Sequence, residues 1–596
     1  MIYAIVGHRG VGKTSFLQRL KNYFDVRMQP CHVLDLDSEI EQRTGQTIPE
    51  IFKNNGEPYF RNLERTIFAQ VLEEVSNNSG IKFIALGAGF DGAIPGGVRV
   101  LWLRRPTDRA GRIFVDRPRL DGDIAPLKEF MNRYDARDER FRKIYHKEIM
   151  LSEGWDFVND FEPYLLGLKP ASMGGCVTVL PEYVQNPRRL DLFIEEFSVL
   201  GVQYFELRDD LLPDDVIAHV ASKIPAEKVL ISFRKPERSS NLVELSKMYA
   251  VDWASELGES PFDKTAILSL HVRKPDESVD EAAERLLSNK AEHYKLALPV
   301  EDFVELWSGH RFFTEDPERR SFLPMSRHGR WQWYRAFHGR KMKVNFVRRG
   351  EGSSPDQPLL FDYLRMPKRA IGFAAVLGDP VGHSRTPAEH SEFFREREVA
   401  TVAIQMNEYE CNSLNMSVLQ RLGLVAAAVT SPLKKKIMDV CTYIDKKALD
   451  LSAVNTIIQT PSGWNGTNTD VNGVEAMFAA IEMPEEVAVW GGGGTRLVLK
   501  KVLPHAHFFS ARRGEEIWVE KQTPMQPEVV VWALGRSRVD TSQMPPVEWR
   551  PKYVMDLNYS EDSPGLEYAL EVGAKYISGK SLFRAQARMQ REYWTR

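Results

Sequence analysis

The amino-acid sequence predicts a multidomain α/β protein from its length, its strand pattern and its breaks in composition. The chain has 596 residues, which at about 150 residues per domain allows three or four domains. Short apolar runs typical of buried parallel strands alternate with polar segments of helical periodicity. Proline, glycine and serine interrupt this pattern around 168–175 and 364–370, which predicts domains at 1–165, 170–365 and 368–596.

Composition and charge exclude several classes of protein. Hydrophobic residues make up 43% and charged residues 27% of the chain, so it can bury cores and is neither disordered nor fibrous. The net charge of −3 offers no general attraction for nucleic acid. No apolar run approaches the roughly 20 residues of a membrane span, and glycines and a lysine come too early for a signal peptide. Four scattered cysteines fit reduced thiols and a cytoplasmic location.

A glycine-rich loop follows the first predicted strand. The apolar run at 2–6 indicates a buried strand, and the sequence GHRGVGKT comes directly after it and opens a helix. In this context glycines let backbone N–H groups point at phosphates, the lysine reaches the β- and γ-phosphates, and the threonine holds Mg²⁺. The loop predicts a nucleotide site made of Gly7, Gly10, Gly12, Lys13 and Thr14.

Two acidic residues and an arginine follow in positions that suit a phosphoryl acceptor. Asp35 and Asp37 end the second predicted strand, at 32–37, and share one face because side chains alternate along a strand. One carboxylate could sit near Mg²⁺ and the other on a substrate hydroxyl. Arg61, in the segment 56–64, is suited to bind a carboxylate through two parallel hydrogen bonds.

These motifs resemble those of shikimate kinase, a P-loop α/β sandwich that phosphorylates shikimate with ATP. The resemblance covers the Asp-x-Asp at 35–37 and the segment 56–64. It also covers Gly87-Ala88-Gly89 after the third strand and the lid sequence RPRL at 117–120. The family therefore predicts ATP and Mg²⁺ as the cofactors of the first domain.

The resemblance also implies a role for individual residues. Thr14 and Asp35 would serve Mg²⁺, and Asp37 would orient or deprotonate the accepting hydroxyl. Arg117 would close over the phosphates as part of the lid. The implied shikimate ligands are Arg61, Gly87, Gly89 and Arg137.

The second domain places a lysine and a histidine on apolar strands. His271 follows ILSL, and Lys295 lies within EHYKLAL. Burying a charged lysine among apolar residues costs folding free energy unless the lysine is paired or becomes neutral. A neutral lysine can form a Schiff base with a ketone. A nearby histidine can move the protons that this chemistry requires. From these residues alone, a lysine reaching water and a hydrogen-bonded core histidine remain the alternative.

Charged residues at two further strand ends favour a β/α barrel, in which such ends meet at one mouth. Glu206 and Arg208 end one strand, and Arg234 ends another. The stretch is similar to type I 3-dehydroquinate dehydratase, a (β/α)₈ TIM barrel that requires no cofactor. The resemblance implies that Lys295 forms the Schiff base and His271 is the general acid and base. The implied substrate ligands are Glu206, Arg208, Arg234 and, from a lid loop at 353–357, Gln357.

Two positions of this stretch depart from the family. The glutamate that follows the arginine matching Arg234 is not at its usual place, since Glu237 lies one residue early. The simplest register puts Trp333 where the family has a late strand-end arginine, with Arg330 and Arg335 nearby. These departures concern substrate binding, whereas the lysine and the histidine are present.

The third domain contains a glycine cluster typical of dinucleotide binding. The residues Gly491, Gly492, Gly493 and Gly494 follow the strand VAVW. About 20 residues on, where an NAD site places an acidic residue, the chain has Arg512 and Arg513. Two arginines without a carboxylate favour a 2′-phosphate, so the sequence predicts a Rossmann NADP part at 481–575.

Four motifs upstream of the glycine cluster supply hydroxyls, amides, one lysine and one aspartate, at 382–387, 429–434, 453–456 and 466–470. They resemble shikimate dehydrogenase in order and spacing. The resemblance implies a substrate part at 368–480 plus the C-terminal helix, with Lys434 and Asp470 as the catalytic pair. The implied substrate ligands are Ser384, Thr386, Thr430, Asn455, Tyr559 and Gln586. Ala428 and Trp532 depart from the family's usual Asn and Asn-Ala-Thr motifs.

The three regions follow the order of the last three domains of the fungal AROM polypeptide. The resemblance predicts a trifunctional enzyme that dehydrates 3-dehydroquinate, reduces 3-dehydroshikimate with NADPH and phosphorylates shikimate with ATP. Its partners would be these small molecules, with a homodimer as a candidate assembly. The alternative is a non-enzymatic sensor or repressor built from the same domains. Retention of Lys13, His271, Lys295, Lys434 and Asp470 favours an enzyme.

Overall fold

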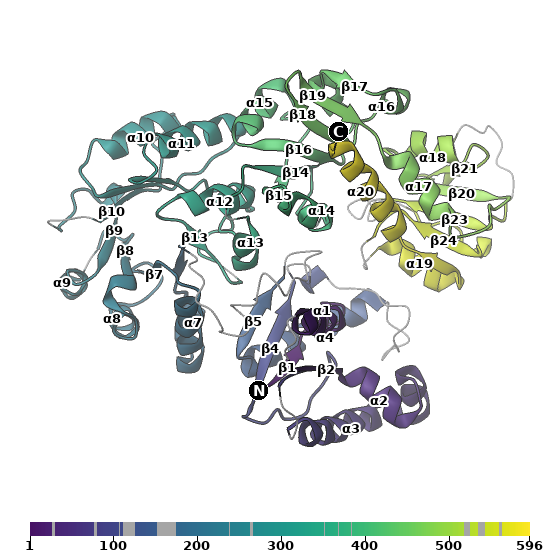
Figure 1. Ribbon diagram of the computed structural model, residues 1–596, viewed down its shortest axis with the longest axis horizontal. Helices are drawn as coiled ribbons and strands as arrows, with labels where there is room; N and C mark the ends of the chain where they lie inside the picture. The colour runs from purple at the N-terminus through teal and green to yellow at the C-terminus, as the bar shows by residue number, and fades with distance from the viewer. Residues whose placement is uncertain are drawn as a thin grey trace.

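The computed structural model describes most of the chain. The residues outside the description are 27–29, 77–79, 106–107, 111–125, 152–173, 238, 263–265, 351, 368, 383, 518–524, 535–542, 560–562 and 596. Four β-sheets follow one another along the described sequence. Figure 1 shows them in the order of the colour bar, with α20 (Lys580–Trp594) returning to lie beside α14 (Thr386–Arg395) and α17 (Asp470–Phe478).

The first sheet has five parallel strands in the order β2-β3-β1-β4-β5. Tyr3 and Ile5 of β1 pack into one apolar cluster, while Ala4 and Val6 pack into another on the opposite face. Both faces are therefore covered, as in an α/β sandwich. The strands are β1 (Ile2–Val6), β2 (Cys31–Asp35), β3 (Ile81–Ala85), β4 (Val98–Arg104) and β5 (Lys147–Met150). The helices are α1 (Lys13–Val26), α2 (Leu36–Thr44), α3 (Ile48–Ser76) and α4 (Pro126–Ile144).

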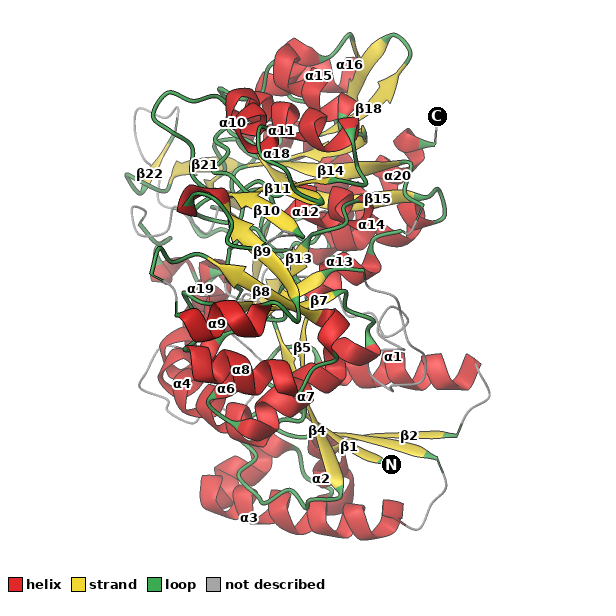
Figure 2. Cartoon of the chain, turned by 90° about the vertical axis from the view of Figure 1, so that its left-hand side faces the viewer, coloured by secondary structure: helices red, strands yellow, loops and turns green. Residues whose placement is uncertain are grey.

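The second sheet has eight parallel strands in the order β12-β11-β10-β9-β8-β7-β6-β13. The strand that comes last in the chain, β13, therefore pairs with the strand that comes first, β6. Figure 2 shows β7 to β11 succeeding one another. Val344, just before β13, donates its N–H to Ser321 of β12 at 3.1 Å. This arrangement is consistent with the predicted (β/α)₈ barrel. The strands are β6 (Cys176–Thr178), β7 (Tyr204–Arg208), β8 (Val229–Phe233), β9 (Ala250–Ala254), β10 (Ile267–Leu270), β11 (His293–Leu296), β12 (Arg320–Phe322) and β13 (Phe346–Val347).

Helices connect most of these strands. Between β9 and β10, the described residues contain only a short 3₁₀ turn, η4 (Ser255–Leu257), in place of an α-helix. The helices are α6 (Pro181–Val184), α7 (Pro187–Val199), α8 (Asp214–Ser222), α9 (Ser240–Ser246), α10 (Val279–Leu287), α11 (Phe303–Glu315), α12 (Gln332–His338) and α13 (Leu360–Arg365).

The remaining two sheets have six strands each, in the orders β15-β14-β16-β18-β19-β17 and β22-β21-β20-β23-β24-β25. The first contains β14 (Gly372–Gly378), β15 (Val399–Gln405), β16 (Leu424–Val429), β17 (Tyr443–Ile444), β18 (Thr456–Thr460) and β19 (Gly463–Thr467). The second contains β20 (Val487–Gly491), β21 (His507–Ser510), β22 (Glu515–Glu516), β23 (Val529–Ala533), β24 (Tyr553–Asp556) and β25 (Lys575–Ile577). Further helices are α15 (Ser413–Arg421), α16 (Lys446–Leu451), α18 (Arg496–Val502) and α19 (Pro564–Val572).

The C-terminal helix α20 anchors the end of the chain to the first of these two sheets. Trp594 Nε1 donates to the carbonyl of Ile457 at 3.0 Å, and Gln590 bonds His390 at 3.0 Å. Within the described part of the chain, no helix combines the length and apolar character that crossing a membrane would require.

Candidate active sites

The glycine-rich loop joins β1 to α1. Gly10 and Gly12 adopt φ angles of +74° and +101°, a region that glycine reaches without strain. Lys13 Nζ donates to the backbone carbonyls of Gly7 and His8 at 3.0 and 3.3 Å. Because α1 begins at Lys13, the N–H groups of its first turn open toward the loop. The loop therefore has the form of a phosphate cradle.

Thr14 and Asp35 lie together beside this loop. The Thr14 hydroxyl donates to Asp35 Oδ2 at 2.7 Å, which places two hard oxygen ligands side by side, as Mg²⁺ prefers. Asp35 Oδ1 also accepts the N–H of Asp37 at 3.1 Å and so caps α2. The strand therefore ends at Asp35, and Asp37 lies in the first turn of a helix. The prediction that both aspartates share one strand face is wrong for this reason.

Predicted residues from three separate segments converge on one another, namely Asp37, Arg61 and the pair Gly87 and Gly89. A Cβ at Gly87 would lie 2.5 Å from Glu64 Oε1 and 3.3 Å from Asp37 Oδ1. A Cβ at Gly89 would collide with the guanidinium of Arg61. Both positions therefore require the close backbone approach that glycine allows. Arg61 in turn pairs with Glu64 at 2.5 Å.

Arg137 places a second cation close to Arg61. Burial, together with the charges of Arg133 and Arg61, lowers the pKa of Arg137 to about 10. An anion bound between Arg137 and Arg61 would offset their repulsion, which suits a substrate carboxylate.

Glu64 was not predicted as a site residue. Burial raises the pKa of Glu64 to about 7, although the charge of Arg61 acts in the opposite direction. Arg117 lies outside the described residues.

The predicted residues of the eight-stranded sheet form a buried cluster of opposite charges. Lys295 of β11 makes an ion pair with Asp252 of β9. Arg234 Nη2 lies 2.5 Å from Asp252 Oδ2 and 3.6 Å from Glu206 Oε1. The exposed fractions of Lys295, Asp252 and Glu206 are 2%, 0% and 3%. Asp252 was missed in the sequence, although a lone carboxylate within the strand AVDWA was a signal of the same kind as Lys295.

The charged residues of this cluster shift one another's pKa values. Burial lowers the pKa of Lys295, and the attraction of Asp252 opposes that shift. Burial alone would raise the pKa of Asp252, but the charges of Arg234, Lys295 and His271 hold it well below its usual value. Lys295 therefore requires less free energy to become a neutral amine than an exposed lysine would.

The loop after β13 reaches the same cluster. Gln357 Nε2 donates to Ser353 Oγ at 2.9 Å, and Ser353 Oγ lies 3.3 Å from Thr178 Oγ1. Thr178 donates to Glu206 Oε2 at 2.6 Å. Gln357 is 4% exposed, so the loop covers the cluster as a closed lid would.

His271 and Arg208 lie at strand ends beside the cluster. The N–H of His271 donates to Glu256 Oε1, and its ring Nδ1 lies 3.7 Å from Glu256 Oε2. Burial and the charge of Arg234 lower the pKa of His271 to about 4, so the ring is neutral at pH 7. Arg208 forms two hydrogen bonds with Asp210, at 2.6 and 2.9 Å.

The dehydrogenase-like residues converge on one carboxylate. Asp470 Oδ2 accepts from Lys434 Nζ at 2.6 Å. Asp470 Oδ1 accepts from Asn455 Nδ2 at 2.8 Å and from Gln586 Nε2 at 2.6 Å. Lys434 follows β16, Asn455 precedes β18, Asp470 begins α17 and Gln586 lies on α20. Four distant segments thus supply one hydrogen-bonded group.

A second polar group lies on the loop before α14. Ser384 Oγ donates to Thr386 Oγ1 at 3.1 Å, and the Arg385 guanidinium lies 5.9 Å from the ring centre of Tyr559. Thr430 N–H donates to the carbonyl of Leu377, which brings the segment before Lys434 against β14. Ser384 and Thr386 are thereby in contact, and Tyr559 lies near Arg385, the residue between them.

The glycine turn after β20 has the geometry of a dinucleotide site. Gly491 and Gly492 adopt φ angles of +91° and +82°. A Cβ at Gly493 or Gly494 would meet nothing within 4 Å, so this side of the turn is open to a ligand. Arg512 and Arg513 follow β21, the strand next to β20, and both are exposed. These residues fit NADP, because cations beside an open glycine turn can hold a 2′-phosphate.

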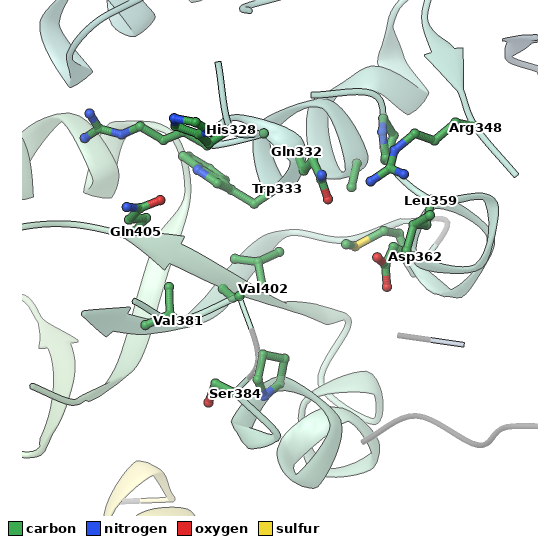
Figure 3. Close-up of a pocket in the computed structure, with 18 residues that line it drawn as sticks. His328, Gln332, Trp333, Arg348, Leu359, Asp362, Val381, Ser384, Val402 and Gln405 are labelled. Carbon is green, nitrogen blue, oxygen red and sulfur yellow. The ribbon is translucent and has the colours of Figure 1, made fainter. Parts of the chain in front are cut away.

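A cavity of about 300 Å³ lies between the eight-stranded sheet's last helices and the third region (Figure 3). His328, Trp333 and Arg348 line one side, and Ser384 and Val402 line the other. Trp333 also packs across this boundary on Phe373, with ring centres 5.2 Å apart. Of the predicted site residues that the structure describes, Ser384 alone lines the cavity. The cavity is therefore separate from the groups around Lys295 and Lys434.

Comparison with protein families supports two of the three regions. Residues 9–149 match the model of shikimate kinase, and residues 376–457 match that of the shikimate dehydrogenase substrate-binding domain. A pentafunctional AROM polypeptide of Yarrowia lipolytica is 24% identical over 581 residues, or 83% of this chain. A shikimate dehydrogenase (NADP(+)) of a Synechococcus species is 26% identical over 37% of this chain and 86% of its own length.

The chain spans about a third of the Yarrowia polypeptide, 36% of its length. Among solved structures, the dehydroquinate dehydratase and shikimate dehydrogenase from S. pombe AroM is 19% identical, with a TM-score of 0.28, covering 72% of this chain and 96% of that one. Shikimate dehydrogenase 1 of Peptoclostridium difficile is 21% identical, with a TM-score of 0.33, covering 38% of this chain and 91% of that one. Residues 9–149 are thus similar to shikimate kinase, residues 376–457 are similar to the substrate-binding domain of shikimate dehydrogenase, and most of the chain is similar to a pentafunctional AROM polypeptide.

Proposed function

We propose that one chain carries three working active sites of the shikimate pathway, for 3-dehydroquinate dehydration, 3-dehydroshikimate reduction and shikimate phosphorylation. The observation that supports this most is convergence. In each region, chemically suited residues from distant segments meet in one group, and the best example is Asp470 with Lys434, Asn455 and Gln586. Shared core packing would not require a lysine, an aspartate and two amides at one point.

In the kinase site, the chain's residues hold both substrates in place. The loop N–H groups and Lys13 would bind ATP phosphates, and Thr14 and Asp35 would hold Mg²⁺, which neutralises phosphate charge when bound. Arg61 and Arg137 would bind the shikimate carboxylate. Asp37, close to Gly87, would then accept the proton of the attacking hydroxyl.

In the dehydrogenase site, Lys434 and Asp470 would handle the proton that accompanies hydride transfer. NADPH supplies the hydride when bound. Lys434 Nζ donates a proton to the carbonyl oxygen of 3-dehydroshikimate as it becomes a hydroxyl, and Asp470 holds the lysine in position through its hydrogen bond. Asn455 and Gln586 present amides to the ring hydroxyls of the substrate. Arg512 and Arg513 would select NADP over NAD.

In the eight-stranded sheet, a closed barrel would bring Lys295 and His271 to one mouth. The neutral amine of Lys295 adds to the C3 ketone of 3-dehydroquinate and expels water to give an imine. His271 takes a proton from C2, and the C1 hydroxyl leaves as water with a proton returned by His271. Hydrolysis of the imine then releases 3-dehydroshikimate and restores Lys295.

Three separate assays of the purified chain test this proposal. We expect NADPH-dependent reduction of 3-dehydroshikimate, shikimate-dependent ADP release, and formation of 3-dehydroshikimate from 3-dehydroquinate. A Lys13→Ala variant should lose ADP release and retain the other two activities. A chain that binds these metabolites but turns none of them over would contradict the proposal and would support the sensor alternative.

A further inference from the structure

We infer that Glu256 is the positioning residue for the His271 imidazole, an inference that rests on the proposed dehydratase function. Glu256 lies on η4, directly after β9, whereas His271 follows β10, the neighbouring strand. The pair thus joins two adjacent strand ends of one sheet. The carboxylate therefore reaches the histidine from the neighbouring strand.

The two oxygens of Glu256 have different neighbours. Oε1 accepts the backbone N–H groups of His271 and Val272, the latter at 2.8 Å. These bonds fix the chain where β10 ends, and they also hold the carboxylate still. Oε2 lies 3.7 Å from His271 Nδ1, within ion-pair range. A backbone cap alone would use Oε1, whereas the second oxygen is aimed at the ring.

This geometry selects one form of the imidazole. A carboxylate oxygen accepts but cannot donate, so its charge favours a proton on Nδ1, which would leave Nε2 as the free base. The other charges near His271 are Arg234 and Lys295, which disfavour the imidazolium, and Asp252, which favours it. Glu256 therefore stabilises the imidazolium that forms each time the ring takes the C2 proton.

Replacement of Glu256 by glutamine separates these two roles. The amide oxygen can still accept the two backbone N–H groups, but an NH₂ group then faces Nδ1 and favours the wrong tautomer. We expect kcat for dehydration to fall about 100-fold or more, the loss typical of an amide in place of a carboxylate that orients a histidine. Borohydride should still attach material derived from 3-dehydroquinate to Lys295, because formation of the first imine does not pass through His271.

The pH profile gives a readout that a purely structural role would leave unchanged. Without the charge of Glu256 the pKa of His271 falls further, so the acid limb of kcat/KM moves to lower pH. Glu256→Asp keeps the charge and should recover part of kcat. Glu259→Gln removes an exposed carboxylate of the same loop and should behave as the unmodified chain does.

Each outcome decides the matter. A large loss of kcat with a shifted acid limb and preserved trapping supports the inference. If Glu256→Gln loses no more than Glu259→Gln, or if only its thermal stability falls, Glu256 is a backbone cap and the inference is wrong. If the unmodified chain traps no product on Lys295, the proposed dehydratase function fails first, and the inference fails with it.

Discussion

The dehydrogenase site and the dehydratase-like site are each built around one carboxylate, but different groups hold it. Asp470 meets one cation and two neutral amides. Asp252 meets two cations, Lys295 and Arg234, in a place that is fully buried. In the first arrangement a single cation pairs with the carboxylate, and neutral amides satisfy its other oxygen. In the second, the proposed substrate carboxylate would have to compete with Asp252 for Arg234, which would link substrate binding to the charge state of Lys295.

The largest effect expected from this difference is at Lys295. Lys295→Met removes the amine, so borohydride reduction in the presence of 3-dehydroquinate should leave no product attached to the chain. Mass spectrometry of the intact protein measures the added mass. Lys290→Met, which changes an exposed lysine five residues away, is the control. Trapping that persists in Lys295→Met would show that another lysine reacts.

The next effect concerns the proton donor of the dehydrogenase site. Asp470→Asn leaves the amide neighbours in place but removes the charge that holds Lys434, so kcat for 3-dehydroshikimate reduction should fall by about 100-fold or more. Asp450→Asn, an exposed aspartate on α16, serves as the matched control. Borohydride trapping on Lys295 should be unchanged in the same protein. A kcat within about threefold of the original would remove Asp470 from the catalytic pair.

A smaller effect is expected at the cofactor. Replacement of Arg512 and Arg513 by serine removes the charges placed for a 2′-phosphate, so the preference in kcat/KM for NADPH over NADH should fall by about 10- to 100-fold. Steady-state rates with each cofactor give the ratio. A preference for NADH in the unaltered chain would overturn the role assigned to these arginines.

The smallest effect is a dependence of stability on pH that differs in sign between the two regions. Burial raises the pKa of Asp556 in β24 to about 6, so its contribution to folding is complete at low pH and is lost as the pH rises through about 6, by up to about 3 kcal/mol. Asp252 has a lowered pKa, so its contribution is lost as the pH falls below about 4.

Thermal unfolding followed from pH 3 to 8 measures both effects. The transition that NADP⁺ shifts upward should move down as the pH rises from about 4 to 6, and Asp556→Asn should flatten this change. An Asp556→Asn protein with the same pH dependence as the original would show that another group is responsible.

The sequence predicted the regions whose residues form contiguous motifs and missed those that depend on the pairing of strands. The loop at 7–14 is one contiguous motif, in which Lys13 bonds the loop carbonyls. Lys434 and Asp470 belong to two motifs 36 residues apart, and the structure joins them by a hydrogen bond. Asp252 and Glu256 contribute through neighbours 43 and 15 residues away in sequence, which only the sheet register reveals. Asp37 was misplaced because the preference of Asp35 for a helix N-cap ended the strand early.

The central claim is that one chain contains three working sites, and conversion of 3-dehydroquinate by the purified protein tests it most directly. With NADPH, ATP and Mg²⁺ present, the account predicts shikimate 3-phosphate as the final product, with one NADP⁺ and one ADP formed per molecule. Mass spectrometry and enzymatic measurement of the two nucleotides provide the balance. If 3-dehydroquinate remains unchanged while added 3-dehydroshikimate is converted, the dehydratase site does not work and the three-site account is contradicted.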